Sequence, residues 1–241
     1  MINFPGKEKY DAQDLRKIVE ILRGEGGCPW DREQTHATLR RNLLEETAEL
    51  CEAIDREDLA LMKEELGDVW LQVLFHASIE QENGSFDLDD VADAECRKLI
   101  SRHPHVFADV QVSDLNAELS MWEDLKRSEK RQRTAADAMD AVCRTLPGLW
   151  RAEKIQKKAA HSLPEMPDAG ALLREVRSDT DRLAESIESG ADAGPALGEL
   201  LFDLVKIARL AGVDPEAALH AKCEDYIRVF RMAEESEPIQ R

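Results

Sequence analysis

Two clusters of acidic residues lie close together in the first third of the chain, at spacings that suit metal chemistry. The first is Glu45-Glu46-x-x-Glu49 and the second is Glu65-x-x-Asp68. Because residues three apart share one face of a helix, two antiparallel helices joined by a tight turn can aim four of these carboxylates at one point. Converging carboxylates repel one another unless a cation lies between them. Hard oxygen ligands suit Mg²⁺ or Mn²⁺, so the pattern favours metal-dependent phosphate chemistry.

A solvated acidic surface is the competing explanation, because the chain contains 50 Asp and Glu residues and clusters arise by chance. The local context favours a metal site. Gly67 leaves open space beside the second cluster, and the apolar run of residues 69–75 follows it directly. A di-iron bundle would need Glu-x-x-His motifs, but Gln72 and Val73 stand four and three residues before His76. Ligands typical of zinc are likewise missing near the clusters, so all-oxygen ligation favours Mg²⁺.

The elements that position these residues are predicted to be helices, because apolar side chains recur at helical spacing along most of the chain. The fold class is therefore all-α. We expect helices at residues 11–24, 36–55, 57–82, 87–101, 114–132, 169–189, 195–211 and 214–235. Breaks are expected at residues 24–29 and at Asn83-Gly84.

The chain is predicted to hold two helical domains in tandem. Residues 1–130 form the first, a polar stretch at residues 131–146 is the linker, and residues 147–241 form the second. A faint internal repeat supports this division, since the run Leu66-Gly67-Asp68 resembles Leu197-Gly198-Glu199.

Net charge and cysteine content indicate which binding partners and which cellular compartment to expect. The formal net charge of −18 disfavours nucleic acid and anionic membranes, but not a nucleotide, because a bound metal inverts the local field. The five cysteines are scattered and odd in number, which favours free thiols in a reducing cytoplasm. We expect no membrane span and no signal peptide, since no run approaches roughly 18 apolar residues.

At these residues the chain resembles the MazG family of all-α nucleoside triphosphate pyrophosphohydrolases. The motifs that carry the resemblance are Gly27-Cys28-Pro29-Trp30-Asp31-x-x-Gln34-Thr35-His36, Leu44-Glu45-Glu46-Thr47-x-Glu49, Glu65-Leu66-Gly67-Asp68 and Arg102-His103-Pro104-His105-Val106-Phe107. The acidic signature alone is moderately specific, and its combination with the flanking motifs is strongly specific. The second half resembles the second domain of the family.

The resemblance implies hydrolysis of a nucleoside triphosphate to the monophosphate and pyrophosphate, with Mg²⁺ as cofactor and Mn²⁺ as a possible substitute. Carried over residue by residue, it implies that Glu46, Glu49, Glu65 and Asp68 are metal ligands and that Glu45 is an additional or outer ligand. It also implies a homodimer of helical bundles. Either Glu49 or Glu45 is expected to take the proton of the attacking water.

Cations and aromatic residues are expected to complete the substrate site. Lys98 and Arg102 lie four apart on one helix face, and Lys63 is a weaker candidate for phosphate contact. Positive charge at a helix end is the alternative explanation for the first two. Trp30 is a candidate for stacking on a base, as is Trp122, although an anchored loop Trp and a core Trp explain them as well.

The second domain departs from the acidic pattern. Pro195 or Ala196 stands where Glu65 would be, and Arg182 falls opposite Glu49. We therefore expect activity in the first domain and a degenerate second domain that serves packing or oligomerisation.

Two other functions stay open. A pyrophosphatase specific for one dNTP, or for phosphoribosyl-ATP, uses similar acidic helices. A helical module that binds nucleotide or metal without turnover belongs to a different class. A broad preference for NTP and dNTP bases, with a housekeeping role in the nucleotide pool, is the favoured hypothesis.

Overall fold

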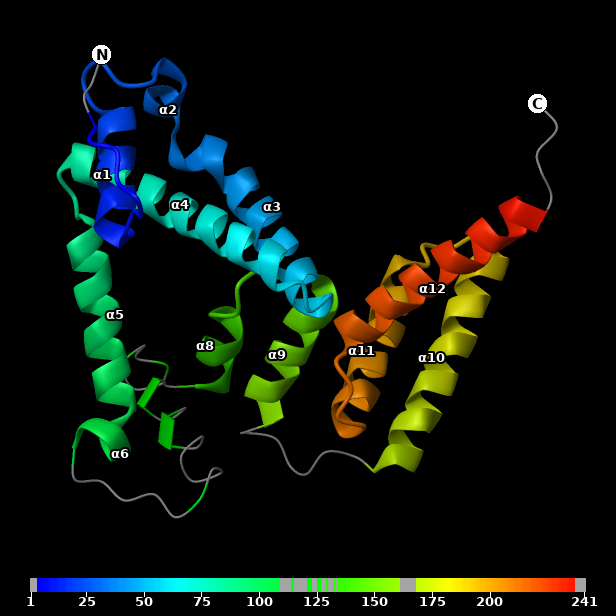
Figure 1. Cartoon of the computed structure of the whole chain (residues 1–241). Coiled ribbons are helices and arrows are strands. Elements are labelled where there is room, and N and C mark those ends of the chain that lie inside the picture. Colours follow the sequence, from blue (N-terminus) through cyan, green and yellow to red (C-terminus); the bar gives the residue numbers. More distant parts are fainter. Residues whose placement is uncertain are drawn as a thin grey trace. The chain divides into compact units, whose positions relative to one another are not determined.

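The computed structural model describes residues 4–108, 134–160 and 168–236, together with isolated residues between 114 and 132. The regular elements of the described residues are helices, with no strand among them, which confirms the all-α class. The chain divides into two compact units, residues 1–115 and residues 116–241 (Figure 1). Among the described residues, no helix has both the length and the apolar content that a membrane crossing requires.

The centre of the first unit is a hairpin of two antiparallel helices, α3 (His36–Asp55) and α4 (Leu59–Asn83). Thr35 begins α3 with a capping box, and the Asp58 carboxylate accepts hydrogen bonds from the first backbone N–H groups of α4. The turn between the helices is short, and Glu57 within it adopts a φ of 53°. These local signals fix where the two acidic helices start and how closely they follow each other.

Apolar side chains hold this hairpin together at the end away from its turn. Leu39 of α3 packs against Phe75 and Ile79 of α4, and all three side chains are buried. Helix α1 (Ala12–Arg23) packs on α4 through the buried Val19. Burial of apolar surface is the main contribution to the stability of such a unit.

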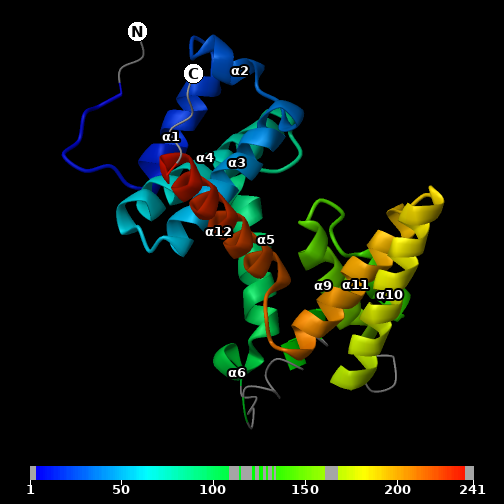
Figure 2. The same cartoon turned by 90° about the vertical axis from the view of Figure 1, so that its right-hand side faces the viewer.

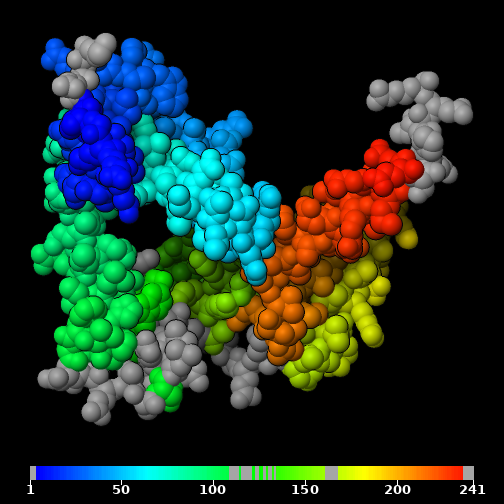
Figure 3. Space-filling model, in the orientation of Figure 1, coloured from blue at the N-terminus to red at the C-terminus, as the bar shows by residue number. Residues whose placement is uncertain are grey.

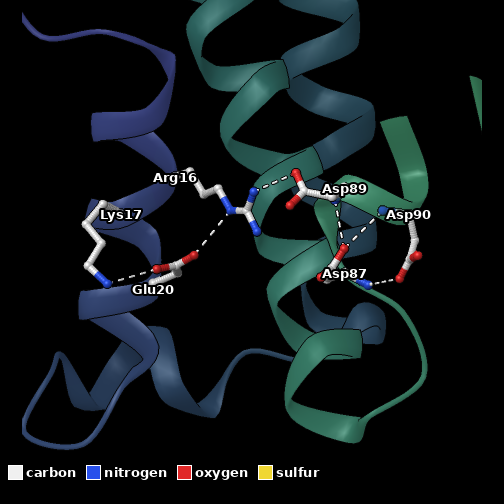
Figure 4. Close-up of polar contacts among 6 residues, drawn as sticks. All are labelled: Arg16, Lys17, Glu20, Asp87, Asp89 and Asp90. Atoms are coloured by element: carbon white, nitrogen blue, oxygen red, sulfur yellow. Dashed lines mark hydrogen bonds and ion pairs between the residues drawn. The ribbon is translucent and has the colours of Figure 1, made fainter. Parts of the chain in front are cut away.

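Ion pairs tie α1 to the helix that follows the hairpin, α5 (Leu88–Arg102). The Arg16 guanidinium contacts Asp89 at 2.7 Å and Glu20 at 3.2 Å, as Figure 4 shows. Asp87 caps α5, where its carboxylate accepts hydrogen bonds from the N–H groups of Asp89 and Asp90. The first turn of α5 is therefore held both by its own cap and by α1.

Arg23 is a buried cation that joins three segments of the first unit. Its guanidinium donates to both carboxylate oxygens of Glu82, at 2.7 and 2.8 Å. It also donates to the carbonyl oxygens of Asp31 at 2.6 Å and of Gln34 at 3.3 Å. These bonds anchor the short helix α2 (Pro29–Glu33). This helix begins at the last residue of the break that was expected at residues 24–29.

The second unit is built around another helical hairpin. Its described helices are α8 (Ala135–Asp140), α9 (Gly148–Ala160), α10 (Ala169–Ser189), α11 (Gly194–Leu210) and α12 (Pro215–Ser236). Figures 1 and 2 show α10 and α11 side by side with α9 next to α11. Leu172 and Val205 are fully buried between these helices. The Gln156 amide of α9 donates to the carbonyl oxygen of Phe202 at 2.7 Å, which fixes α9 to α11.

The expected helices that lie within the described residues begin and end within two residues of their predicted positions. The expected helix at residues 114–132 falls largely outside the described residues. Helix α8 lies inside the stretch expected to be a linker, and α6 (Pro104–Phe107) follows α5 directly. Gly84 and Gly212 both adopt a positive φ just after a helix. The relation between the two domains stays a prediction.

Candidate metal centre

Three of the predicted ligands converge in the middle of the α3–α4 hairpin. Glu46 and Glu49 come from α3 and Glu65 comes from α4, and one carboxylate oxygen of each lies within 4.8 Å of the others. Glu65 is 7% exposed, and its Oε2 atom is buried without a hydrogen-bond partner. A buried carboxylate oxygen without a donor is costly, so this arrangement calls for a positive partner.

The pKa values of the cluster also indicate that a positive partner is needed. Burial raises the pKa of Glu65 above its ordinary value, and the charges of Glu49, Asp68 and Glu46 raise it further. Burial also raises the pKa of Glu46, with contributions from Asp68, Glu49 and Glu45. Asp68 therefore lies close enough to raise the pKa of both glutamates, although its carboxylate is not one of the three that converge. Each carboxylate here disfavours the charge of its neighbours.

The donor set fits a hard divalent cation. The converging atoms are all carboxylate oxygens, which Mg²⁺ and Mn²⁺ prefer, and the cluster contains no sulfur or imidazole donor. The unpartnered Glu65 oxygen and the raised pKa values are relieved together if a cation binds between the two helices. The residues present thus suit the metal that the sequence predicted.

Glu45 and Lys63 lie beside the cluster without joining it. The Glu45 carboxylate accepts a hydrogen bond from Arg41 at 2.7 Å, one helical turn earlier on α3, and both side chains are largely exposed. Lys63 is exposed near the start of α4. The predicted roles of these two residues stay predictions.

Lys98 and Arg102 are not brought to the cluster by the structure. Lys98 pairs with Glu95 on its own helix, and Arg102 is buried in the last turn of α5. Helix α5 follows the end of α4 at Asn83, which lies roughly 27 Å along the helix axis from Glu65 (Figure 1). Their proposed contact with phosphate stays a prediction.

The two candidate tryptophans have different surroundings. Trp30 is 58% exposed on α2, and its carbonyl oxygen accepts a hydrogen bond from the Gln34 amide at 2.9 Å. The ammonium group of Lys126 lies 4.5 Å from the ring centroid of Trp122, so that ring already has a cation partner. Base stacking stays a prediction for Trp30.

Sequence reasoning missed a second polar group on the hairpin. The rings of His36 and His76 stack with centroids 4.9 Å apart, and their Nδ1 atoms lie 2.7 Å from each other. His36 Nε2 contacts Glu80 at 2.6 Å. It also missed Gln72, which is 5% exposed. Gln72 lies at a polar position on the buried side of α4, and that pattern was the available signal for it, whereas His36 is exposed.

The corresponding part of the second unit contains acidic residues together with built-in cations. Asp179 of α10 is 2% exposed and pairs with Arg182 on the same helix. Asp203 of α11 is 4% exposed and accepts a hydrogen bond from Lys206 at 2.6 Å. Asp179, Glu199 and Asp203 all raise the pKa of Arg182. These carboxylates thus face cations of their own chain.

Comparison with known proteins extends what the site shows. The family model described as "MazG nucleotide pyrophosphohydrolase domain" matches residues 34–107, which include every residue of the acidic cluster.

Several curated proteins are similar over most of the chain. The protein named nucleoside triphosphate pyrophosphohydrolase of Escherichia coli (strain K12) is 40% identical over 225 residues, which cover 91% of this chain and 86% of the relative. The protein named nucleoside triphosphate pyrophosphohydrolase/pyrophosphatase MazG of Thermotoga maritima is 37% identical over 223 residues, 92% of this chain and 85% of the relative. The Bacillus subtilis protein named YabN is 40% identical over 230 residues, and the matched region of this chain covers 47% of its length.

Proposed function

Since this chain belongs to the MazG nucleotide pyrophosphohydrolase family, we propose that its first unit hydrolyses nucleoside triphosphates to the monophosphate and pyrophosphate at the acidic cluster of α3 and α4. The observation that supports this site best is the convergence of oxygens from Glu46, Glu49 and Glu65 within 4.8 Å. The buried, unpartnered oxygen of Glu65 adds to it.

The cofactor that we propose is Mg²⁺, with Mn²⁺ as a substitute, held by Glu46, Glu49, Glu65 and Asp68. When bound, such a cation neutralises phosphate oxygens and lowers the pKa of a nearby water molecule. The chain contributes the positions of these carboxylates, which two rigid helices fix. A pre-formed acidic cluster of this kind orients a triphosphate without reorganising during the reaction.

Glu49 is the residue that we propose as general base. It is exposed, whereas Glu65 is buried, so an attacking water can reach it. Glu45 was the other candidate, but its carboxylate is paired with Arg41 and lies outside the three that converge. Lys98, Arg102, Lys63 and Trp30 are proposed to contact the phosphates or the base of the substrate.

A homodimer is also proposed. Helix α12 exposes large apolar side chains, among them Tyr226, Ile227 and Phe230 at 68%, 48% and 58%. Figure 3 shows this helix as an orange-to-red ridge on the surface of the second unit. Apolar area of this kind is a common basis for association, and sedimentation equilibrium of the full chain measures it directly. A broad base range, a housekeeping role and a cytoplasmic location belong to the same proposal.

The deciding experiment measures pyrophosphate release from the eight natural NTPs and dNTPs with Mg²⁺. We expect wild-type protein to turn over several of them and Glu49→Gln to lose nearly all release, because the variant removes a ligand and the proposed base. Glu52→Gln, on the exposed surface of α3, is the matched control and keeps wild-type turnover.

Two results of this experiment contradict parts of the proposal. Turnover of a single substrate would favour the base-specific dNTP pyrophosphatase over the broad enzyme. No release from any substrate, with nucleotide or metal binding intact, would favour the non-catalytic binding module.

A further inference from the structure

Gln72 occupies a position of α4 that faces α3, where helical hairpins normally place apolar side chains. The residues of α4 that face α3 recur at spacings of three and four, and they are Glu65, Asp68, Gln72, Phe75 and Ile79. The first two are the carboxylates of the proposed centre, and the last two pack against Leu39. Gln72 thus lies at the junction between the metal centre and the apolar core.

The Gln72 side chain is held there without a partner for its oxygen. The residue is 5% exposed, and its Oε1 atom is buried with no hydrogen-bond partner in the protein. Such an amide oxygen destabilises the folded state, whereas an apolar side chain of the same size would stabilise it. Glu65 Oε2 has the same property two helical turns earlier on the same face. Both atoms lie on the face of α4 that also carries Asp68, and neither has a donor within the protein.

We propose that Gln72 Oε1 accepts a hydrogen bond from a water molecule in the hydration shell of the divalent cation at the acidic cluster. This inference rests on the proposed function. Mg²⁺ and Mn²⁺ keep several waters when they bind to carboxylates, and a water polarised by a cation is a strong donor. Gln72 is then a positioning residue, which orients the hydrated cation between Glu46, Glu49 and Glu65.

The helix geometry fits one intervening water. Asp68 and Gln72 are separated by four residues, which is about 6 Å along the axis. A metal–water distance of about 2.1 Å and an O–H···O bond of about 2.8 Å together span about 5 Å, so a water lets Gln72 act on a cation about one helical turn away. A nucleobase or ribose is much larger than a water, so a water is the better-fitting donor for an oxygen that is buried to this extent.

In the second unit, the residue at the position of Gln72 has a hydrogen-bond donor from the chain itself. The repeat places Asp203 of α11 opposite Gln72, four residues after Glu199 as Gln72 is four residues after Asp68. Asp203 is buried to the same degree, and its carboxylate accepts a hydrogen bond from Lys206 at 2.6 Å. An acceptor at this position thus faces a donor in the second unit, and in the first unit we assign that donor to the hydrated cation.

The test measures Mn²⁺ binding to the full chain without nucleotide, by electron paramagnetic resonance of the free ion. Gln72→Leu removes the acceptor, and we expect about tenfold weaker binding, as for other residues that orient a metal from outside its ligand shell. Gln72→Glu keeps an oxygen at the same place and binds at least as tightly as wild type. Gln81→Leu, an exposed position on the same helix, is the matched control and leaves the affinity unchanged.

Thermal unfolding of the metal-free protein provides a second readout, which separates positioning from packing. Gln72→Leu is expected to melt at the wild-type temperature or above it, because the variant removes a buried acceptor without a donor. Lower metal affinity together with undiminished stability is a combination that a purely structural glutamine would not produce.

Three outcomes would overturn the inference. The first is unchanged Mn²⁺ affinity in Gln72→Leu, and the second is an equal loss in Gln72→Leu and Gln72→Glu. The third is a rise in KM for the nucleotide with unchanged Mn²⁺ affinity, which would place Gln72 against the nucleoside. Failure of the wild-type chain to bind Mn²⁺ would instead overturn the proposed function, and this inference with it.

Discussion

The α3–α4 and α10–α11 hairpins both contain buried acidic residues, but these residues have different partners in the two hairpins. In the first, Glu46, Glu49 and Glu65 converge, and burial together with neighbouring carboxylates raises the pKa of Glu46 and of Glu65. In the second, Arg182 pairs with the buried Asp179. The second hairpin thus pairs its buried carboxylate with a cation of its own chain, whereas in the first hairpin we propose that a metal ion is the partner.

This difference shows how similar helical hairpins can be suited either to binding a cation or to packing alone. A hairpin whose carboxylates lack a partner is less stable by itself and gains stability when it binds a cation. A hairpin with built-in ion pairs needs no ligand, and its arginine would repel a metal. If the predicted repeat holds, Arg182 stands opposite Glu49, and this one substitution changes the sign of the charge at that position.

The largest expected effect concerns where turnover occurs. Glu46→Gln is expected to lower kcat/KM for nucleoside triphosphates by at least about a hundredfold, since even residues that support a ligand from outside cost 10–100-fold. Glu199→Gln, at the position of Asp68 in the second hairpin, leaves kcat/KM within about twofold. Pyrophosphate release measures both, and a larger loss in Glu199→Gln would reverse the assignment of the two hairpins.

The next effect concerns stability with metal. At a Mg²⁺ concentration about a hundredfold above its Kd, opening of α3 and α4 becomes less favourable by about 2.7 kcal/mol, whereas α10 and α11 do not change. Hydrogen exchange with mass spectrometry resolves the two hairpins. Glu65→Gln serves as the control and loses the added protection. Equal protection of both hairpins by Mg²⁺ would contradict the comparison.

The second hairpin is expected to depend on its own cation. Arg182→Ala leaves the Asp179 carboxylate buried without its partner and lowers the free energy of unfolding of this unit by about 2 kcal/mol. Arg228→Ala removes an arginine from an exposed pair with Asp225 and changes stability by less than about 0.5 kcal/mol. Urea unfolding measures both variants, and similar values for the two would show that Arg182 is not a replacement cation.

The smallest effect is a difference in acid sensitivity. Burial lowers the pKa of His76 below 6.5, with a contribution from the charge of His36, so the folded state binds fewer protons than the unfolded state. The stabilising contribution is complete above pH 6.5 and decreases as the pH falls from 6.5 towards the lower, folded pKa. The α10–α11 hairpin contains no histidine and lacks this dependence. We expect a loss of about 1 kcal/mol or less.

Hydrogen exchange at pH 7.5 and pH 5.5, corrected for the intrinsic rate, tests this difference. His76→Gln should reduce the acid sensitivity of α3 and α4 by the contribution of this one residue. If that variant keeps the full wild-type dependence on pH, then His76 does not contribute to the acid sensitivity of α3 and α4.

The extent of the helices could be predicted from the sequence because their signals are local. The α3 bounds match the expected residues 36–55, since Thr35 caps the first turn through neighbouring backbone groups. Gly84 ends α4 near the expected residue, because a positive φ there suits glycine. The pairing of Glu46 with Glu49, and of Glu65 with Asp68, follows from helical spacing in the same way.

Contacts between distant residues could not be predicted with the same rules. Arg23 and Glu82 are 59 residues apart, and their ion pair exists because α1 packs on α4. His36 meets His76 across 40 residues. The burial of Gln72 likewise depends on which side of α4 the α3 helix covers. Periodicity finds the buried face of each helix but not its partner.

By itself, the sequence determined that two acidic helices exist and that each presents its carboxylates on one face. Only the tertiary structure decided which of these carboxylates converge, because the axial register of α3 against α4 is set by the packing of Leu39 on Phe75 and Ile79. That register brings Glu49 to Glu65 and leaves Glu45 with Arg41. Helical spacing is a property of one segment, whereas a metal centre is a property of two segments packed together.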